Sequence, residues 1–171
     1  MRTASKILIG GVIFYLGKHV YSLNRAKNKI ATDVGGRLHK LGMEGVEVAL
    51  KFNIKNPTSA SIKMTAPLIK LSYNGKILAT SSITRLEIPE DARSASGKIK
   101  IKPESETGFI TTRMLIPYLS LLGAGANLLQ RLKATLEGSV DTPVLLQVAT
   151  TSHVQSAIGT FPYDDLVTIE V

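Results

Sequence analysis

The chain has no cysteine and no tryptophan, and aromatic residues make up only 5% of its 171 residues. Without cysteine the protein has no disulfide, no thiolate metal site and no cysteine nucleophile. A surface that stacks bases or sugar rings needs several aromatic side chains, which this composition does not supply. The shortage therefore argues against a carbohydrate-binding platform or one for single-stranded nucleic acid.

Histidine is scarce as well, and the residue types that carry catalysis do not occur in a catalytic spacing. No two histidines are spaced to share a helix face, as metal-ligand pairs usually do. No serine stands in a Gly-x-Ser-x-Gly elbow, and we expect the adjacent pair Asp164-Asp165 to occupy a turn. The sequence thus predicts no enzyme, no cofactor and no metal site. The three histidines are His19, His39 and His153.

Acidic residues are missing from the first 29 residues, and this absence accounts for most of the net charge of +8. Six of the 21 basic residues lie there, which leaves 15 basic and 13 acidic residues for the remainder. Basic residues that flank an apolar run favour anionic lipid headgroups, whereas nucleic-acid binding calls for a basic patch on the folded body. We therefore expect contact with lipid headgroups and no specific nucleic acid. The expected headgroup contacts are Arg2, Lys6, Lys18, Arg25, Lys27 and Lys29.

A charge-free apolar run covers residues 7–17 and is bounded by Lys6 and Lys18. As a helix this run spans about 17 Å, against about 30 Å of hydrocarbon, although snorkelling lysines extend it. An uncleaved anchor fits better than a cleaved signal peptide, because no small-x-small cleavage site follows. A buried core or assembly helix stays open, and so do full span and shallow insertion. The expected anchor residues are Ile7, Leu8, Ile9, Val12, Ile13, Phe14, Tyr15 and Leu16.

Two units are expected: an anchor helix with a basic stalk over residues 1–29, and a β-sandwich domain over residues 30–171. Helical spacing continues to about Ile30, and we expect Gly35-Gly36 to break any helix and to start the domain. Basic residues on both sides of the apolar run leave the membrane orientation open, although the larger downstream cluster mildly favours a cytoplasmic body. The expected location is a cell envelope or a virion membrane.

Alternating hydrophobicity predicts a mostly β body. Residues 46–55 place five apolar side chains on one face, a period of two that is typical of a half-buried antiparallel strand. Asn74-Gly75 joins two further runs, at 66–73 and 76–80, as a two-residue hairpin. About seven short strands with turns between them predict an antiparallel sandwich. The other expected strands cover residues 83–88, 98–102, 107–116, 144–154 and 160–171.

One helical insert is expected within residues 117–134. Leucines predict helical pieces at 118–122 and 128–134, hinged at Gly123-Ala124-Gly125, with Gly138 ending the second piece. The insert is more apolar than one small sandwich needs to close an end. It is therefore a candidate contact surface for another protein.

Two short motifs resemble those of a known family. In residues 50–60 a hydrophobic strand ends in Asn56-Pro57, and residues 71–79 contain the hairpin Tyr73-Asn74-Gly75. In these motifs, and in the position of its helical insert, the chain is similar to the type-2 late embryogenesis abundant proteins, which share the water-stress and hypersensitive-response (WHy) domain. The resemblance implies a seven-stranded sandwich like that of fibronectin type III, no catalytic site, and a role in stress protection or at membranes. From the residues alone, Asn56 and Pro57 are expected to shape a turn.

We expect a non-catalytic module, anchored in a membrane, with a binding, protective or structural role and with membrane lipids as partners. The alternative is a structural component of a larger assembly, such as a membrane-containing virion or an envelope complex. In that hypothesis the N-terminal helix is embedded in the membrane or in a neighbouring protein. Other proteins would bind through this helix or through the insert at residues 117–134.

Overall fold

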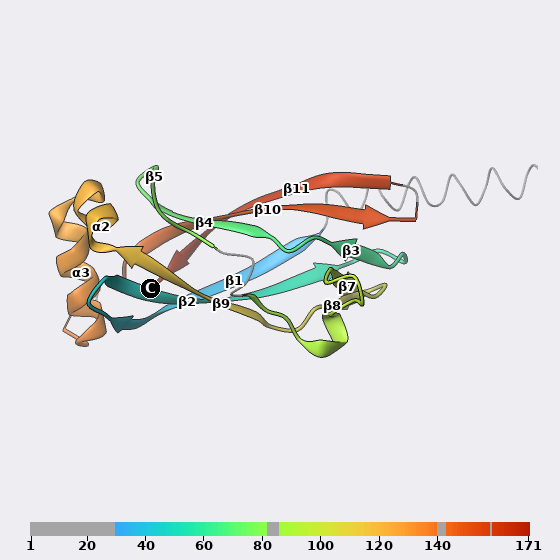
Figure 1. Cartoon of the computed structure of the whole chain (residues 1–171), viewed down its shortest axis with the longest axis horizontal. Coiled ribbons are helices and arrows are strands. Elements are labelled where there is room, and N and C mark those ends of the chain that lie inside the picture. The colour runs from blue at the N-terminus through green and yellow to red at the C-terminus, as the bar shows by residue number, and fades with distance from the viewer. Residues whose placement is uncertain (1–29, 82–85, 140–142, 158) are drawn as a thin grey trace, which may run out of the picture.

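The computed structural model describes residues 30–81, 86–139, 143–157 and 159–171. The predicted anchor and all six predicted headgroup contacts lie outside these residues. Within them, no helix has both the length and the hydropathy of a membrane span. This part of the chain is an elongated, mostly β body of eleven strands, with two α-helices gathered at one end (Figure 1).

The strands form two antiparallel sheets. The five-stranded sheet has the order β1-β2-β9-β6, and β8 pairs with the end of β2. Its strands are β1 (Ala31–Leu41), β2 (Gly45–Asn56), β6 (Leu86–Glu87), β8 (Ser105–Glu106) and β9 (Ile110–Pro117). The six-stranded sheet has the order β5-β4-β10-β3-β7, and β11 pairs with β10. Its strands are β3 (Ile62–Met64), β4 (Leu68–Tyr73), β5 (Lys76–Thr80), β7 (Ile99–Ile101), β10 (Leu145–Ser156) and β11 (Gly159–Glu170).

The alternation of β2 produces one inner and one outer face, as predicted. Lys51 and Lys55 are exposed on the outer face, while the apolar residues between them point into the core. Burial of such side chains contributes about 1.5–3 kcal/mol each before entropy is counted. The pattern therefore fixes which way β2 faces. The five core residues, each at most 2% exposed, are Val46, Val48, Leu50, Phe52 and Ile54.

The predicted Asn-Gly hairpin is confirmed between β4 and β5. Tyr73 lies opposite Lys76, so the loop has two residues. Asn74 has φ of 48° and Gly75 has φ of 77°. Both central residues of a type I′ turn need positive φ, which asparagine and glycine adopt more readily than other residues.

The predicted helical insert is confirmed as two helices, α2 (Tyr118–Ala124) and α3 (Ala126–Leu136). Gly125 separates them with φ of 128°. Their buried side chains, which close one end of the core, are Leu121, Leu128 and Leu132. The Tyr118 hydroxyl donates to the Gly42 carbonyl at 2.7 Å, which ties α2 to the turn between β1 and β2.

Three expectations from the sequence are wrong. The described residues contain eleven strands and not about seven, since the two- and three-residue strands β3, β6, β7 and β8 are too short for alternation to identify all of them. Gly35-Gly36 does not start the domain, because it lies inside β1. Asp164-Asp165 occupies β11 rather than a turn, and pairs with Thr151 and Thr150 of β10.

Both sheets bury their inner faces in one shared core. At the seam between β1 and β11, side chains of the core fill the space beside Gly36. A Cβ atom there would stand 2.4 Å from Ile169 Cδ1 and 3.1 Å from Leu50 Cδ2. Glycine at this position allows the two sheets to approach.

Candidate functional site

The outer face of the five-stranded sheet carries a hollow of about 760 Å³, bounded by β1, β2, β6 and β9. Its size falls within the range of small-molecule sites. Because successive residues of a strand alternate between faces, the side chains that reach the hollow come from every second position. They form two rows across the sheet: Arg37, Ala49 and Arg113 in one, and Gly35, Lys51, Thr111 and Glu87 in the next.

Small residues make the floor of this hollow. Gly35 has no side chain, and a Cβ atom built there would meet no atom within 4 Å. Ala49 lies between the two arginines of its row. A larger side chain at Gly35 would project into the open space. The hollow therefore exists because two adjoining outward positions carry almost no side-chain volume.

The two acidic side chains on the hollow, Glu47 and Glu87, each contact a neighbour, although Glu47 Oε2 is buried without a hydrogen bond and Glu87 has no cationic partner among the described residues. Lys40 Nζ lies 3.4 Å from Glu47 Oε2, and the Thr111 hydroxyl donates to Glu87 Oε2 at 2.8 Å. The cations differ, because neither Arg37 nor Arg113 has a hydrogen bond or ion pair among the described residues. Lys51 has only a ring contact, with its Nζ 5.8 Å from the centroid of Phe109.

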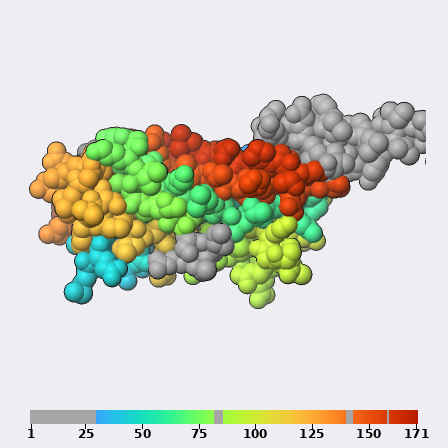
Figure 2. Space-filling model, turned by 45° about the horizontal axis from the view of Figure 1, so that its top comes forward, coloured from blue at the N-terminus to red at the C-terminus, as the bar shows by residue number. Residues whose placement is uncertain are grey.

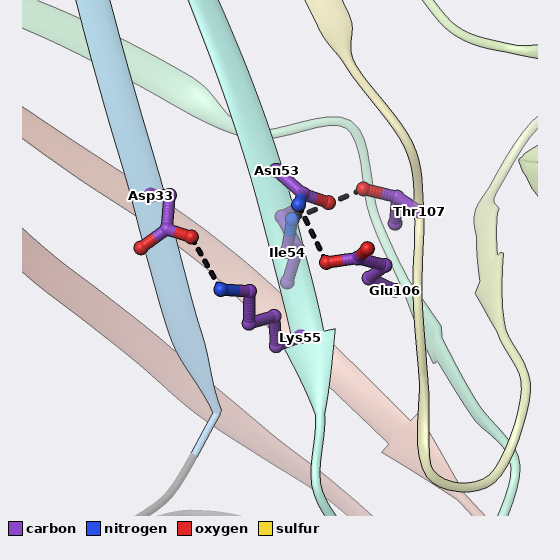
Figure 3. Close-up of polar contacts among 6 residues, drawn as sticks. All are labelled: Asp33, Asn53, Ile54, Lys55, Glu106 and Thr107. Carbon is purple, nitrogen blue, oxygen red and sulfur yellow. Dashed lines mark hydrogen bonds and ion pairs between the residues drawn. The ribbon is translucent and has the colours of Figure 1, made fainter.

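The same face continues toward the start of β1 as a set of paired polar groups (Figure 3). Lys55 Nζ lies 2.6 Å from Asp33 Oδ2, and this hydrogen bond raises the pKa of Lys55 above its ordinary value. Asn53 Nδ2 donates to Glu106 Oε2 at 2.6 Å. The Ile54 amide donates to the Thr107 hydroxyl at 3.0 Å. These contacts hold β1, β2 and the segment around β8 together.

A second polar group lies in the seam between the sheets. The hydroxyls of Thr32 and Tyr163 are 2.6 Å apart, and Tyr163 also donates to Asp165 Oδ2 at 3.2 Å. Burial raises the pKa of Tyr163 to about 12, although the hydrogen bond with Thr32 opposes the shift. The phenol therefore stays protonated at neutral pH and acts as a link between strands.

Asn56, the last residue of β2, is only 1% exposed. Its Nδ2 donates to the carbonyls of Ala60 at 2.8 Å and Lys102 at 3.0 Å. Its Oδ1 accepts from the Thr58 amide at 3.2 Å and from the Thr58 hydroxyl at 2.7 Å. All the hydrogen-bonding capacity of the amide is thus directed at the turn after β2 and at the loop before β8.

The two histidines among the described residues do not come together. His39 lies on β1 and His153 on β10, in different sheets, and both are exposed. No group of three metal-ligating side chains occurs within the described ranges. His19, like the anchor residues, lies outside them.

The hollow itself was missed at the level of sequence. Gly35 and Arg37 lie on β1, which was not predicted, and Arg113 lies on a predicted strand but was not singled out. A signal was present: Thr32, Val34 and Leu38 alternate with Asp33, Gly35 and Arg37 around the glycine pair. Two glycines in the middle of the run obscured this period of two.

The comparisons with known proteins give solved structures of low sequence identity to this chain. No family model matches the chain, and no curated protein matches it in sequence. A protein from Archaeoglobus fulgidus is 13% identical with a TM-score of 0.47, over 81% of this chain and 94% of its own. A protein from Arabidopsis thaliana is 16% identical with a TM-score of 0.46, over 83% of this chain and 78% of its own.

A third solved structure is provisionally described as a late embryogenesis abundant (LEA) protein. It is 13% identical with a TM-score of 0.42, over 95% of this chain and 84% of its own. The structural neighbours of this mostly β, antiparallel chain therefore include plant and archaeal proteins of low identity, one of them with an LEA description.

Proposed function

We propose that this protein is a non-catalytic binding module with a protective or structural role, held at a membrane by residues 1–29. The observation that carries the proposal is the distribution of charge. Six basic residues and no acidic residue lie in the first 29 residues, around a charge-free apolar run, whereas the rest of the chain is nearly neutral. A cation-flanked apolar segment suits a membrane with anionic headgroups.

The shape of the body is consistent with a tether at one end. The described chain begins at Ile30, at the end of β1 remote from α2 and α3 (Figure 1). A membrane attached through the preceding residues would therefore leave the helical end as the distal end. The outer faces of both sheets would then be available for binding.

The buried polar groups of the body support a structural rather than a chemical use of its interior. Asn56 organises a turn and Tyr163 links two sheets, and neither faces the hollow. The motif residues Pro57 and Tyr73-Asn74-Gly75 also lie at turns. These turn positions, together with the roles of Asn56 and Tyr163, are the reason for proposing a WHy-like sandwich of the fibronectin type III kind.

Membrane partition of the full-length chain tests this proposal. We expect the intact protein to sediment with membranes and to resist extraction by high salt, which weakens surface charge contacts but not apolar insertion. A variant with Ile9→Lys and Ile13→Lys should move to the soluble fraction, because charge in hydrocarbon costs about 2.5–3.5 kcal/mol per residue.

Leu166→Lys provides a matched control for that experiment. Leu166 is 64% exposed on the body, so the substitution adds a lysine without touching the anchor. It should leave the partition unchanged. Recovery of the intact wild-type chain in the soluble fraction would contradict the proposal.

A second candidate function, a component of a larger assembly, is favoured by the apolar helical end. Leu119 is 82% exposed and Leu122 57% exposed on α2, while Ile77 at the start of β5 is 59% exposed and Met43 in the β1–β2 turn is 99% exposed. Figure 2 shows the helices with the β4–β5 turn and the β1–β2 turn at this end. Lys76 Nζ donates to the Gly123 carbonyl at 2.6 Å, which fixes the β4–β5 turn against α2.

The partner in this second hypothesis is a protein that buries the apolar face of α2. Chemical crosslinking of the detergent-solubilised chain in its native membrane extract tests it. Leu119→Lys with Leu122→Lys should abolish a specific crosslinked species, whereas Leu145→Lys, on an exposed leucine of β10, should not. A uniformly monomeric wild-type protein would count against the assembly hypothesis.

A further inference from the structure

We propose that the hollow on the five-stranded sheet is a binding site for a phosphate group. The proposal rests on which charged side chains of this face have a partner within the fold. Of the two acids that border the hollow, Glu47 is ion-paired with Lys40, whereas Glu87 accepts a hydrogen bond from the Thr111 hydroxyl and keeps its charge. Arg37, Arg113 and Lys51 have no ion pair among the described residues, so three cations face one acid, Glu87, that is not ion-paired.

The positions of these cations suit one anionic group. Arg37 and Arg113 face each other across Ala49, on strands either side of β2 and therefore about 10 Å apart at the backbone. Arginine side chains are long enough to converge over that distance. Lys51 follows two residues after Ala49 on the same face. Two guanidinium groups with a nearby ammonium match a phosphate better than a carboxylate, because phosphate offers more acceptor oxygens and more charge.

The floor of the hollow provides the room. Nothing lies within 4 Å of the place where a Gly35 side chain would begin, so a ligand can reach the backbone of β1. The combination of unpaired arginines with a floor of Gly35 and Ala49 distinguishes the hollow from the lysines elsewhere on the two sheets.

A titration of the full-length protein in detergent micelles tests the proposal. Binding is monitored through the amide chemical shifts in NMR spectra. One arm adds inorganic phosphate against sodium chloride of equal ionic strength. The other arm adds phosphatidic acid to the micelles, with phosphatidylcholine as its control. Saturable shifts at Gly35, Ala49 and Arg113 with inorganic phosphate indicate a free phosphate compound as the ligand. Such shifts with phosphatidic acid alone indicate a lipid headgroup.

Four variants make the result specific. Arg37→Gln and Arg113→Gln should each weaken binding by about tenfold, the usual cost of one charge-assisted contact. Arg93→Gln removes an exposed arginine outside the hollow and should change affinity by less than about twofold, as screened surface charges do. Gly35→Val keeps all charges, has space in the folded state, and should abolish binding by filling the floor.

Thermal unfolding of each variant separates loss of the site from loss of the fold. Three outcomes would overturn the proposal: no saturable shift in either arm, an equal loss of affinity with Arg93→Gln, or unchanged binding with a folded Gly35→Val protein. None of these depends on membrane anchoring. The site and the proposed function can therefore fail independently.

Discussion

The hydroxyl of Tyr163 lies 2.6 Å from the hydroxyl of Thr32, although 131 residues separate them in the chain. Thr32 is on β1 of the five-stranded sheet and Tyr163 is on β11 of the six-stranded sheet. Tyr163 also donates to Asp165, so Thr32 supplies the proton of the shorter bond. This buried pair joins the two sheets at the seam where Gly36 allows them to approach.

Removing one member of the pair should destabilise the domain. We expect Tyr163→Phe to lower the free energy of unfolding by about 1–2 kcal/mol, because it leaves the Thr32 hydroxyl buried without a partner. Thr32→Val should cost a similar amount, and the double variant less than the sum of the two. Urea unfolding of all four proteins measures the coupling. Strict additivity would show that the two hydroxyls do not interact.

The raised pKa of Tyr163 predicts a loss of stability at high pH. Its pKa is about 12 in the folded protein against about 10 when unfolded, so the folded state binds the proton more tightly. This contribution is complete below pH 10 and is lost as the pH rises from 10 to 12, by up to about 2 kcal/mol. The difference in unfolding free energy between wild type and Tyr163→Phe should shrink over that range. A constant difference would argue against the shift.

Asn56 should be one of the costliest polar side chains to remove. Asn56→Ala deletes the bonds to Ala60, Lys102 and Thr58 at a site that is 1% exposed. We expect a loss of about 2–4 kcal/mol, because carbonyls and a hydroxyl are left buried without partners. Asn127→Ala, on the exposed surface of α3, should stay within about 0.5 kcal/mol. Thermal and chemical unfolding compare the two variants.

The adjacent glycines of β1 should respond in opposite ways. Gly36→Ala places a Cβ atom against Ile169 and should cost about 1–3 kcal/mol through overpacking. Gly35→Ala meets no atom and should be neutral or stabilising by up to about 1 kcal/mol, since alanine restricts the unfolded chain. Equal destabilisation by both substitutions would contradict the arrangement in which Gly35 faces open space and Gly36 faces Ile169.

The ion pair of Lys55 and Asp33 should contribute little to stability despite its short distance of 2.6 Å. Both side chains are largely exposed, 49% for lysine and 63% for aspartate, and water and salt screen such pairs. The raised pKa of Lys55 means that the lysine stays charged at neutral pH and that the pair is lost at high pH when the lysine deprotonates. Asp33→Asn should therefore leave the melting temperature at pH 7 unchanged. A clear drop would show that the pair is structurally important.

Local patterns predicted the parts of the fold that depend on neighbouring residues. The alternation in β2, the Asn74-Gly75 turn and the helical pieces around Gly125 all agree with the structure. Each is set by backbone preference and by side-chain periodicity within a few residues. β1 was not predicted because Gly35 and Gly36 interrupt its alternation. β3 and β8 were not predicted because a strand of two or three residues is too short to show a period of two.

The candidate site could not be predicted in the same way. Arg37 and Arg113 are 76 positions apart in the sequence and become neighbours of Ala49 only through the order β1-β2-β9. Which acids find a partner depends on strand pairing too, as Glu106 does with Asn53, 53 residues earlier in the chain. Such contacts are long-range, so no window along the chain contains them.

The sequence by itself determined that the charge is concentrated in the first 29 residues and that the body is mostly β, because charge and alternation are properties of the chain alone. Only the tertiary structure decided that Gly35 faces a hollow while Gly36 faces Ile169. It also decided which cations on that face have no partner. Strand order and register set the distances between side chains, and those distances decide which charges are neutralised within the fold and which remain available for a ligand.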